Sequence, residues 1–136
     1  MKSLVGSWKL IKTESVAANG NKLPAPYGGQ RAMGTVTFAA SGRMICVLCD
    51  SANELPPGEK REYNSYCGNY RFDGQQLITV VDASANPAWM NTEQVRDVHF
   101  EGDTLVLRPP LRAYAAEPEQ RTLYWQRMDG PDQNDD

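Results

Sequence analysis

The segment from Asn86 to Phe100, NPAWMNTEQVRDVHF, contains the residues best suited to ligand chemistry. Its first half begins as an Asn-Pro loop. Its second half alternates as a β-strand does, with side chains two apart on one face. The face that ends in Phe100 is the more apolar, so we assign it to the interior, and Arg96 and Gln94 share it. The segment therefore predicts an interior cation and an interior amide, preceded by Trp89 on the loop.

Arg96 needs a partner in such a position, because an unpaired buried charge is expensive. In one interpretation it anchors a carboxylate, enolate or carbonyl oxygen of a ligand, which a guanidinium matches with parallel hydrogen bonds. In the other it forms a structural ion pair with Asp82 or Glu93, or caps one end of the fold. Both interpretations stay open at this point.

Two tyrosines and a tryptophan offer further ligand contacts. Tyr66 and Tyr70 share one face of a predicted strand and are placed either to donate hydrogen bonds to a ligand or to pack as core rings. Trp89 either closes a cavity mouth or anchors its loop in the core. The same alternation predicts an interior wall that suits a small molecule. Its residues are Met44, Cys46, Leu48, Tyr66, Tyr70, Phe72, Gln94, Arg96, Val98, Phe100, Leu105 and Leu107.

Acid–base chemistry has few candidates in this chain. Asp82 is the carboxylate nearest the expected mouth, and it is either a base whose pKa desolvation raises or an exposed turn residue. Arg96, Tyr66 and Tyr70 complete the set of catalytic candidates. His99 is the single histidine, and alternation places it on the outer face, so we do not expect it to be catalytic.

The cysteines do not predict a metal site. Cys46 and Cys49 form a CxxC, but a structural zinc site needs four ligands and no second pair accompanies them. A redox CxxC begins a helix, whereas this one ends a strand-like segment. We expect Cys46, Cys49 and Cys67 to be reduced, buried or half-buried thiols, and we predict neither a metal nor a cofactor.

The composition is that of one ordinary globular domain. The 136 residues are 40% hydrophobic and 23% charged, with a net charge of -3, which argues against nucleic acid and anionic membrane surfaces as partners. The N-terminus lacks the apolar stretch of a secretory signal, so we expect a cytoplasmic protein, as a monomer or homodimer. We expect one domain over residues 1–129 and a disordered acidic tail over 130–136.

Short strands separated by hairpin-type turns fill this domain, with long loops expected at 17–32, 50–60 and 111–119. The pattern predicts an all-β fold, a sandwich or a barrel, and eight antiparallel strands close into a barrel that holds one small ligand. The predicted strands are Gly6–Glu14, Gly34–Phe38, Arg43–Leu48, Tyr63–Phe72, Leu77–Asp82, Thr92–Phe100, Thr104–Arg108 and Gln120–Met128.

The opening Gly6-Ser7-Trp8 resembles the Gly-x-Trp of the first strand of lipocalins, and Arg127 stands where lipocalins place an arginine over that tryptophan. More closely, residues 4–128 resemble the bacterial and fungal lipocalin-like domain family, in the pieces LVGSWKL, ASGRM, YCGNYRFDG, NPAWMNTEQVR, EGDTLVLRPP and LYWQRM. The resemblance implies an eight-stranded, antiparallel, up-and-down β-barrel of the calycin type with a central cavity. Relatives often carry histidines in the strand that is 77–82 here; this strand has none, so no role is transferred from them.

Two functions follow from such a cavity. The first is binding of a small, largely apolar molecule that bears a carboxylate or carbonyl group. The second is a cofactor-free isomerase, cyclase, lyase or hydratase of secondary metabolism or aromatic degradation, in which one cation and two phenols stabilise an oxyanion. We favour binding, because an interior acid–base pair is scarce. An interaction scaffold would need an apolar outer patch, which the alternation does not predict.

Overall fold

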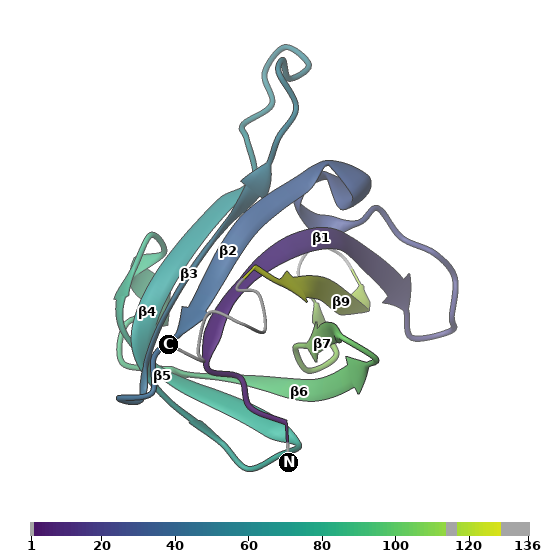
Figure 1. The fold of residues 1–136 in the computed structure, drawn as a ribbon. Helices are drawn as coiled ribbons and strands as arrows, with labels where there is room; N and C mark the ends of the chain where they lie inside the picture. The colour runs from purple at the N-terminus through teal and green to yellow at the C-terminus, as the bar shows by residue number, and fades with distance from the viewer. Residues whose placement is uncertain (1, 114–116, 129–136) are drawn as a thin grey trace.

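The computed structural model describes residues 2–113 and 117–128, and in them a single antiparallel sheet closes on itself (Figure 1). Neighbours in the sheet follow chain order from β1 to β7, β9 comes next, and pairing of β9 with β1 completes an up-and-down barrel. The strands are β1 (Gly6–Ala17), β2 (Ala32–Phe38), β3 (Arg43–Asp50), β4 (Tyr63–Phe72), β5 (Gln76–Ser84), β6 (Glu93–Glu101), β7 (Thr104–Arg108), β8 (Arg112–Ala113) and β9 (Pro118–Arg127).

The predicted eight-stranded barrel is therefore confirmed, with β8 as a two-residue addition that pairs with the start of β9. Two strands coincide with their predicted bounds, β4 and β7. The predicted loop at 17–32 contains a short 3-10 segment, η1 (Pro26–Arg31), and a second one, η2 (Pro87–Trp89), lies between β5 and β6. The predicted domain boundary at residue 129 and the tail at 130–136 lie outside the described residues.

β1 runs three residues further than predicted, because its partner is the long β9. The pairing extends from Trp8 with Arg127 to Ala17 with Glu119, and a bulge between Leu10 and Lys12 shifts the register on the way. An extra residue reverses which face later side chains take. Thr13 is consequently buried although simple alternation from Trp8 would place it outside.

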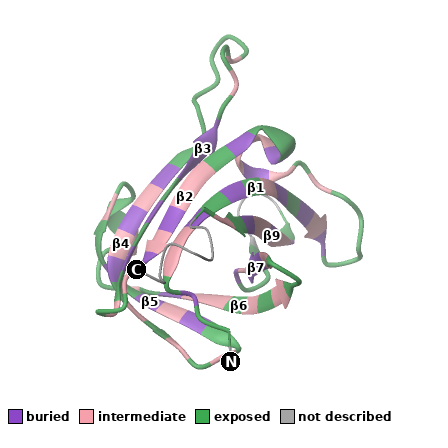
Figure 2. Ribbon diagram, in the orientation of Figure 1, coloured by how far each residue is buried: buried purple, intermediate pink, exposed green. Residues whose placement is uncertain are grey.

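Side chains alternate between the interior and the outer surface along the strands (Figure 2). β3 shows this clearly, with Met44, Cys46 and Leu48 buried and Ile45 and Val47 exposed. The predicted interior face of β3 is therefore the interior face in the structure. The core it joins is a single cluster that includes the largest buried side chains, Trp8, Leu10, Val36, Phe38, Leu77, Val81, Leu105 and Trp125.

Trp8 closes one end of the barrel. It is 2% exposed, its Nε1 donates a hydrogen bond to the Leu4 carbonyl over 2.9 Å, and the Arg127 guanidinium lies 4.1 Å from its ring centroid. Arg127 in turn donates to the carbonyls of Ser3 and Val5. The predicted stacking of arginine on tryptophan is confirmed. Arg127 thus connects the end of β9 to the segment before β1 at the closed end of the barrel.

The glycine in the middle of β4 is a requirement of sheet packing. A Cβ on Gly68 would lie 1.9 Å from the Val80 carbonyl oxygen, which is backbone and cannot rotate away. The register between β4 and β5 shifts between Cys67 and Gly68 at this point. Glycine in a strand interior commonly marks such a close backbone approach.

The outer surface of β2 and β3 is more apolar than alternation predicted. Met33 is 49% exposed, Ile45 53% and Val47 40%. These residues lie on adjacent strands, because Met33 pairs with Cys49 and Thr35 with Val47. β3 is apolar on both faces, whereas an antiparallel strand ordinarily has one polar face. Alternation did not predict these exposed apolar side chains on the outer face of β2 and β3.

Candidate ligand-binding cavity

A cavity of about 690 Å³ occupies the barrel interior. It opens at the end where β3, β5 and β7 finish and β4 and β9 begin. At this end its lining includes residues 60–62 between β3 and β4, Asn86 after β5, and Pro109 and Arg112 after β7. One wall is apolar, and this volume and composition suit a small organic molecule. The apolar lining comprises Val36, Phe38, Met44, Leu48, Leu77, Leu107, Leu123 and Trp125, and the polar lining includes Tyr27, Asn64, Tyr66 and Arg96.

Arg96 projects from β6 into this cavity, as predicted from alternation. Its guanidinium donates to the Val95 carbonyl over 2.9 Å and to Gln94 Oε1 over 3.2 Å. Within residues 2–113 and 117–128, the ion pairs of the structure do not include Arg96. Its charge therefore faces the cavity with neutral oxygen partners.

The structural ion pair considered for Arg96 does not form. Asp82 pairs with Arg43 on the outer surface, and its two oxygens accept from both terminal nitrogens of that arginine. Glu93 pairs with Arg71, also outside, over 3.4 Å. The hydrogen bond from Arg43 holds the pKa of Asp82 below its usual value. A solvent-facing carboxylate with a lowered pKa is poorly suited to act as a base in the cavity.

Tyr66 lies beside Arg96 and lines the same cavity. Burial raises the pKa of its hydroxyl, and the positive charge of the nearby Arg96 guanidinium offsets this only in part. The hydroxyl is therefore a neutral group at physiological pH. Cys46 is close by, and burial raises the pKa of its thiol to about 12, which makes it unreactive as a nucleophile.

Trp89 and Met44 also line the cavity, from η2 and β3. The Trp89 ring packs edge-on against Tyr66, with centroids 5.3 Å apart and planes at 69°. Trp89 is half-buried, and its loop forms one side of the opening together with Asn86. Trp89 was expected either to close the cavity mouth or to anchor its loop in the core. Its position fits both roles, since it contacts the core and lies beside the mouth.

Three predicted ligand contacts lie outside the cavity lining. The Tyr70 hydroxyl donates to the Ala39 carbonyl over 2.9 Å, and its ring packs edge-on against Phe38. Phe72 packs against the core near the closed end. Gln94 is 6% exposed and lies behind Arg96, which it contacts through its side-chain oxygen. Alternation identified the inward face correctly but could not tell at which depth each side chain lies.

Tyr27 is one of the cavity residues that sequence reasoning missed. It belongs to η1, with a left-handed backbone (φ 56°), between Pro26 and Gly28. Burial raises the pKa of its hydroxyl, which a hydrogen bond with the Asn64 side chain partly offsets. The sequence signal was a single aromatic residue in a Gly- and Pro-rich loop, and loops of that length often cover binding sites.

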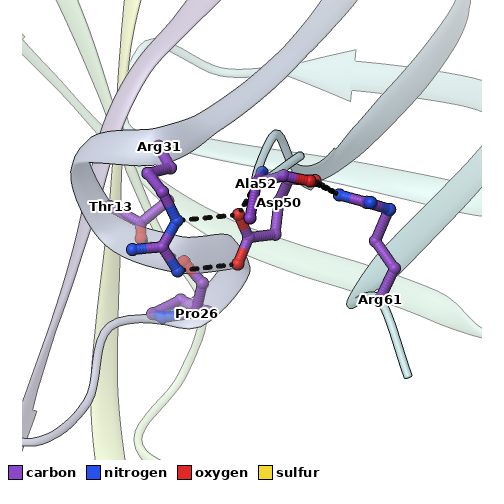
Figure 3. A network of polar contacts seen from close by, with 6 residues as sticks. All are labelled: Thr13, Pro26, Arg31, Asp50, Ala52 and Arg61. Carbon is purple, nitrogen blue, oxygen red and sulfur yellow. Dashed lines mark hydrogen bonds and ion pairs between the residues drawn. The ribbon is translucent and has the colours of Figure 1, made fainter. Parts of the chain in front are cut away.

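A polar network fixes η1 to the end of β3 (Figure 3). Arg31 donates to both Asp50 carboxylate oxygens, over 3.1 and 2.9 Å. Asp50 also accepts from the Ala52 amide, and Arg61 donates to the carbonyls of Asp50 and Ala52. A Cβ on Gly28 would lie 2.6 Å from the Asp50 carboxyl carbon. The carboxylate therefore takes up the space above Gly28 and holds Tyr27 over the cavity.

The mouth carries mostly positive charge. Lys60, Arg61, Arg112 and Arg121 line it, against the carboxylate Glu62. Arg121 forms an ion pair with Glu119 over 2.6 Å, and Arg61 is engaged with backbone carbonyls. These cations come from the loop between β3 and β4, from β8 and from β9, so no single sequence motif predicted them.

Other kinds of site find no support in the part of the chain that the structure covers. No cluster of three or more His, Cys, Asp or Glu side chains is placed to hold a metal there. Cys46 and Cys49 are buried and Cys67 is half-buried, with all three thiols free. His99 is exposed on the outer face. Among the described residues, no helix is long and apolar enough to cross a membrane.

Known proteins similar to this chain were found among solved structures and family models. A crystal structure of an uncharacterized protein from Bacteroides eggerthii aligns with a TM-score of 0.42 and 15% identity, over 90% of this chain and 98% of that one. A search of curated proteins found no match. The family model described as a lipocalin-like domain matches residues 5–128, nearly the whole chain. The chain therefore belongs to the lipocalin-like domain family.

Proposed function

We propose that this barrel binds a small, largely apolar molecule that carries a carboxylate or carbonyl oxygen. The observation that carries the proposal is Arg96, a cation in the cavity whose hydrogen-bond partners in the described chain are neutral. A guanidinium has five N–H donors and no acceptor. A ligand oxygen beside Arg96 would therefore supply the negative partner that the protein itself does not place there.

The surroundings of Arg96 support an acceptor-bearing ligand. The Tyr66 hydroxyl beside it stays protonated, because burial raises its pKa, so it is available as a second donor. The opposite lining is apolar, with Met44 and Leu107 among its residues, and burial of a ligand's hydrocarbon portion contributes about 25 cal/mol per Å² of apolar surface. The ligand thus combines an oxygen acceptor with an apolar body.

The charge at the mouth favours an anion over a neutral carbonyl compound. The entrance carries Lys60, Arg61, Arg112 and Arg121 against Glu62, in a chain whose net charge is -3. Clefts lined by one sign of charge concentrate ligands of the opposite sign and speed their entry. Ion pairing of Arg121 with Glu119 lowers this positive charge but leaves its sign unchanged.

One observation weighs against the enzymatic alternative. Asp82, the base considered for it, points to the outer surface and pairs with Arg43. The carboxylate that does line the described cavity, Glu62, lies on the loop at the entrance rather than beside Arg96 and Tyr66. Proton transfer requires the base within hydrogen-bond reach of the reacting atom, so the cavity is better equipped for binding than for acid–base catalysis.

Fluorescence titration with a matched pair of probes tests the proposal. A dansyl-labelled undecanoic acid and its primary amide share an apolar body and differ in charge. We expect the acid to bind in the barrel roughly tenfold or more tightly than the amide, since it adds a charged contact. If neither probe binds, and native mass spectrometry shows no other small molecule retained, the proposal of a ligand-binding cavity is wrong.

A further inference from the structure

A chain of hydrogen bonds runs from the Arg96 guanidinium to the loop that carries Trp89. Arg96 donates to Gln94 Oε1 over 3.2 Å, Gln94 Nε2 donates to Thr92 Oγ1 over 3.1 Å, and the Thr92 hydroxyl donates to the Trp89 carbonyl over 2.6 Å. Tyr66 provides a second connection, since its ring packs against the Trp89 ring with centroids 5.3 Å apart and it lines the cavity together with Arg96.

The two ends of this chain determine the direction of its bonds, because the Arg96 guanidinium only donates and the Trp89 carbonyl only accepts. Because a guanidinium only donates, Gln94 must turn its amide oxygen toward Arg96 and its NH2 group toward Thr92. Thr92 Oγ1 then accepts from Gln94, so its own proton is directed to the Trp89 carbonyl. Without the arginine, the Gln94 amide would keep its bond to Thr92 but its oxygen would lose its partner, so its orientation would be fixed from one end only.

The links of this chain are partly shielded from water. Gln94 is 6% exposed, and Thr92 is half-buried. Hydrogen bonds in chains of this kind strengthen one another where water is excluded. The loop is also held by backbone bonds, between Val81 and both Asn91 and Thr92 and from the Thr92 amide to the Trp89 carbonyl over 3.1 Å. These backbone bonds do not involve the Arg96 side chain.

We propose that Gln94 and Thr92, which do not line the cavity, are positioning residues that couple the cation at Arg96 to the placement of Trp89 at the mouth. In this arrangement the anchor and the aromatic at the entrance form one cooperative unit. A ligand oxygen at Arg96 uses N–H groups other than the one bonded to Gln94, so occupancy and mouth closure reinforce each other. The ligand-dependent half of this inference rests on the proposed function; the coupling in the free protein does not.

Acrylamide quenching of tryptophan fluorescence in the ligand-free protein tests the coupling. Trp8 and Trp125 are 2% and 1% exposed, so Trp89 dominates the quenching, and Trp89→Phe provides the background. Thr92→Val removes the hydroxyl while keeping a β-branched side chain, and Thr92→Ser retains the hydroxyl. We expect about a twofold rise in the quenching constant for Thr92→Val and a value near wild type for Thr92→Ser, since the hydroxyl bond to the Trp89 carbonyl is lost only in the first.

Gln94→Glu is the sharper variant, because a carboxylate accepts but does not donate when ionised. Arg96 would hold one oxygen of the new carboxylate, and the Thr92 hydroxyl would turn toward the other and leave the Trp89 carbonyl. We expect quenching to rise as it does in Thr92→Val, and Arg96→Met to raise it too, with no further rise when Thr92→Val is combined with Arg96→Met. Unchanged quenching in Gln94→Glu and Arg96→Met, or additive effects in the combined variant, would refute the coupling.

The dissociation rate of the dansyl acid separates this inference from the proposed function. If the coupling operates on ligand, Thr92→Val should release the probe about tenfold faster while Arg96 remains intact, because the mouth is less firmly closed. Thr92→Ser should release it at the wild-type rate. Probe that binds through Arg96 but leaves at the same rate from Thr92→Val would overturn the ligand-dependent half alone, whereas absence of any binding would overturn the proposed function and leave the quenching result standing.

Discussion

Arg96 illustrates how far a single residue can be understood from sequence. Alternation along the strand placed it inside the barrel, and the structure agrees. Alternation could not choose between a ligand anchor and an ion pair, because the pairing of Asp82 with Arg43 depends on which side of β5 faces out. The choice came from geometry: both carboxylates that could have neutralised Arg96 lie on the outer surface, paired with other arginines.

At the same scale, Trp8 should be the residue on which stability depends most. It is 2% exposed, its indole nitrogen is hydrogen-bonded to Leu4, and Arg127 stacks on its ring. We expect Trp8→Ala to lower the free energy of unfolding by about 3–5 kcal/mol, measured by urea denaturation. Trp89→Ala, which truncates a half-buried loop tryptophan, should cost less. A loss below about 1 kcal/mol for Trp8→Ala would show that this end is not packed as described.

At the scale of elements, β4 and η1 mark the limits of prediction. The bounds of β4 were predicted correctly, because strongly alternating residues between clear turn signals identify a strand. η1 was missed, because three of its residues, from Tyr27 to Gly29, have positive φ and follow no periodic pattern. Its position depends on Asp50, which is distant in sequence. Contacts of that kind are not encoded in local spacing.

The attachment of η1 to the barrel should depend on pH. The hydrogen bonds from Arg31 are the main cause of a lowered pKa for Asp50. A carboxyl whose pKa is depressed on folding stabilises the protein above its unfolded pKa, and this contribution is lost as the pH falls through the folded value. Acidification below pH 3.8, the ordinary value for the group, should therefore weaken the attachment.

Asp50→Asn isolates this contribution. We expect the variant to be less stable than wild type at neutral pH and to lose less stability between about pH 5 and pH 3, because the titrating group is gone. Urea denaturation across this range measures both. Asp103→Asn removes a carboxylate from an exposed turn and serves as the control. Parallel pH profiles for wild type and Asp50→Asn would mean that the pair with Arg31 contributes nothing to folding.

At the scale of the whole molecule, the fold was predictable and the site only partly so. Eight strands, their order and the Trp8–Arg127 closure followed from turn signals, alternation and family resemblance. The site combines Arg96 and Tyr66, which alternation identified, with Tyr27 and the cations of the mouth, which it did not. Side chains from several loops converge only when the barrel closes, so their proximity cannot be derived from sequence spacing.

The distribution of charge over the molecule differs between its cavity and the chain as a whole. A chain that is acidic as a whole presents cations at the entrance of its cavity and another cation, Arg96, inside it. The central claim is that this inner charge serves a ligand rather than the fold. A structural role and a ligand-binding role of Arg96 predict opposite effects of its substitution on stability. Removal of one partner of a buried ion pair destabilises the protein, whereas removal of an unneutralised cation does not.

Arg96→Met, measured for both unfolding free energy and affinity for the dansyl acid, tests this claim most directly. Arg71→Met removes a charge from the outer face and serves as the control. We predict that Arg96→Met changes stability by less than about 1 kcal/mol, or raises it, because the desolvated charge is removed. Its affinity for the acid should fall by about 2–5 kcal/mol, with that of Arg71→Met unchanged. A loss of about 3–5 kcal/mol in stability with undiminished affinity of the folded protein would contradict the account and make Arg96 a structural residue.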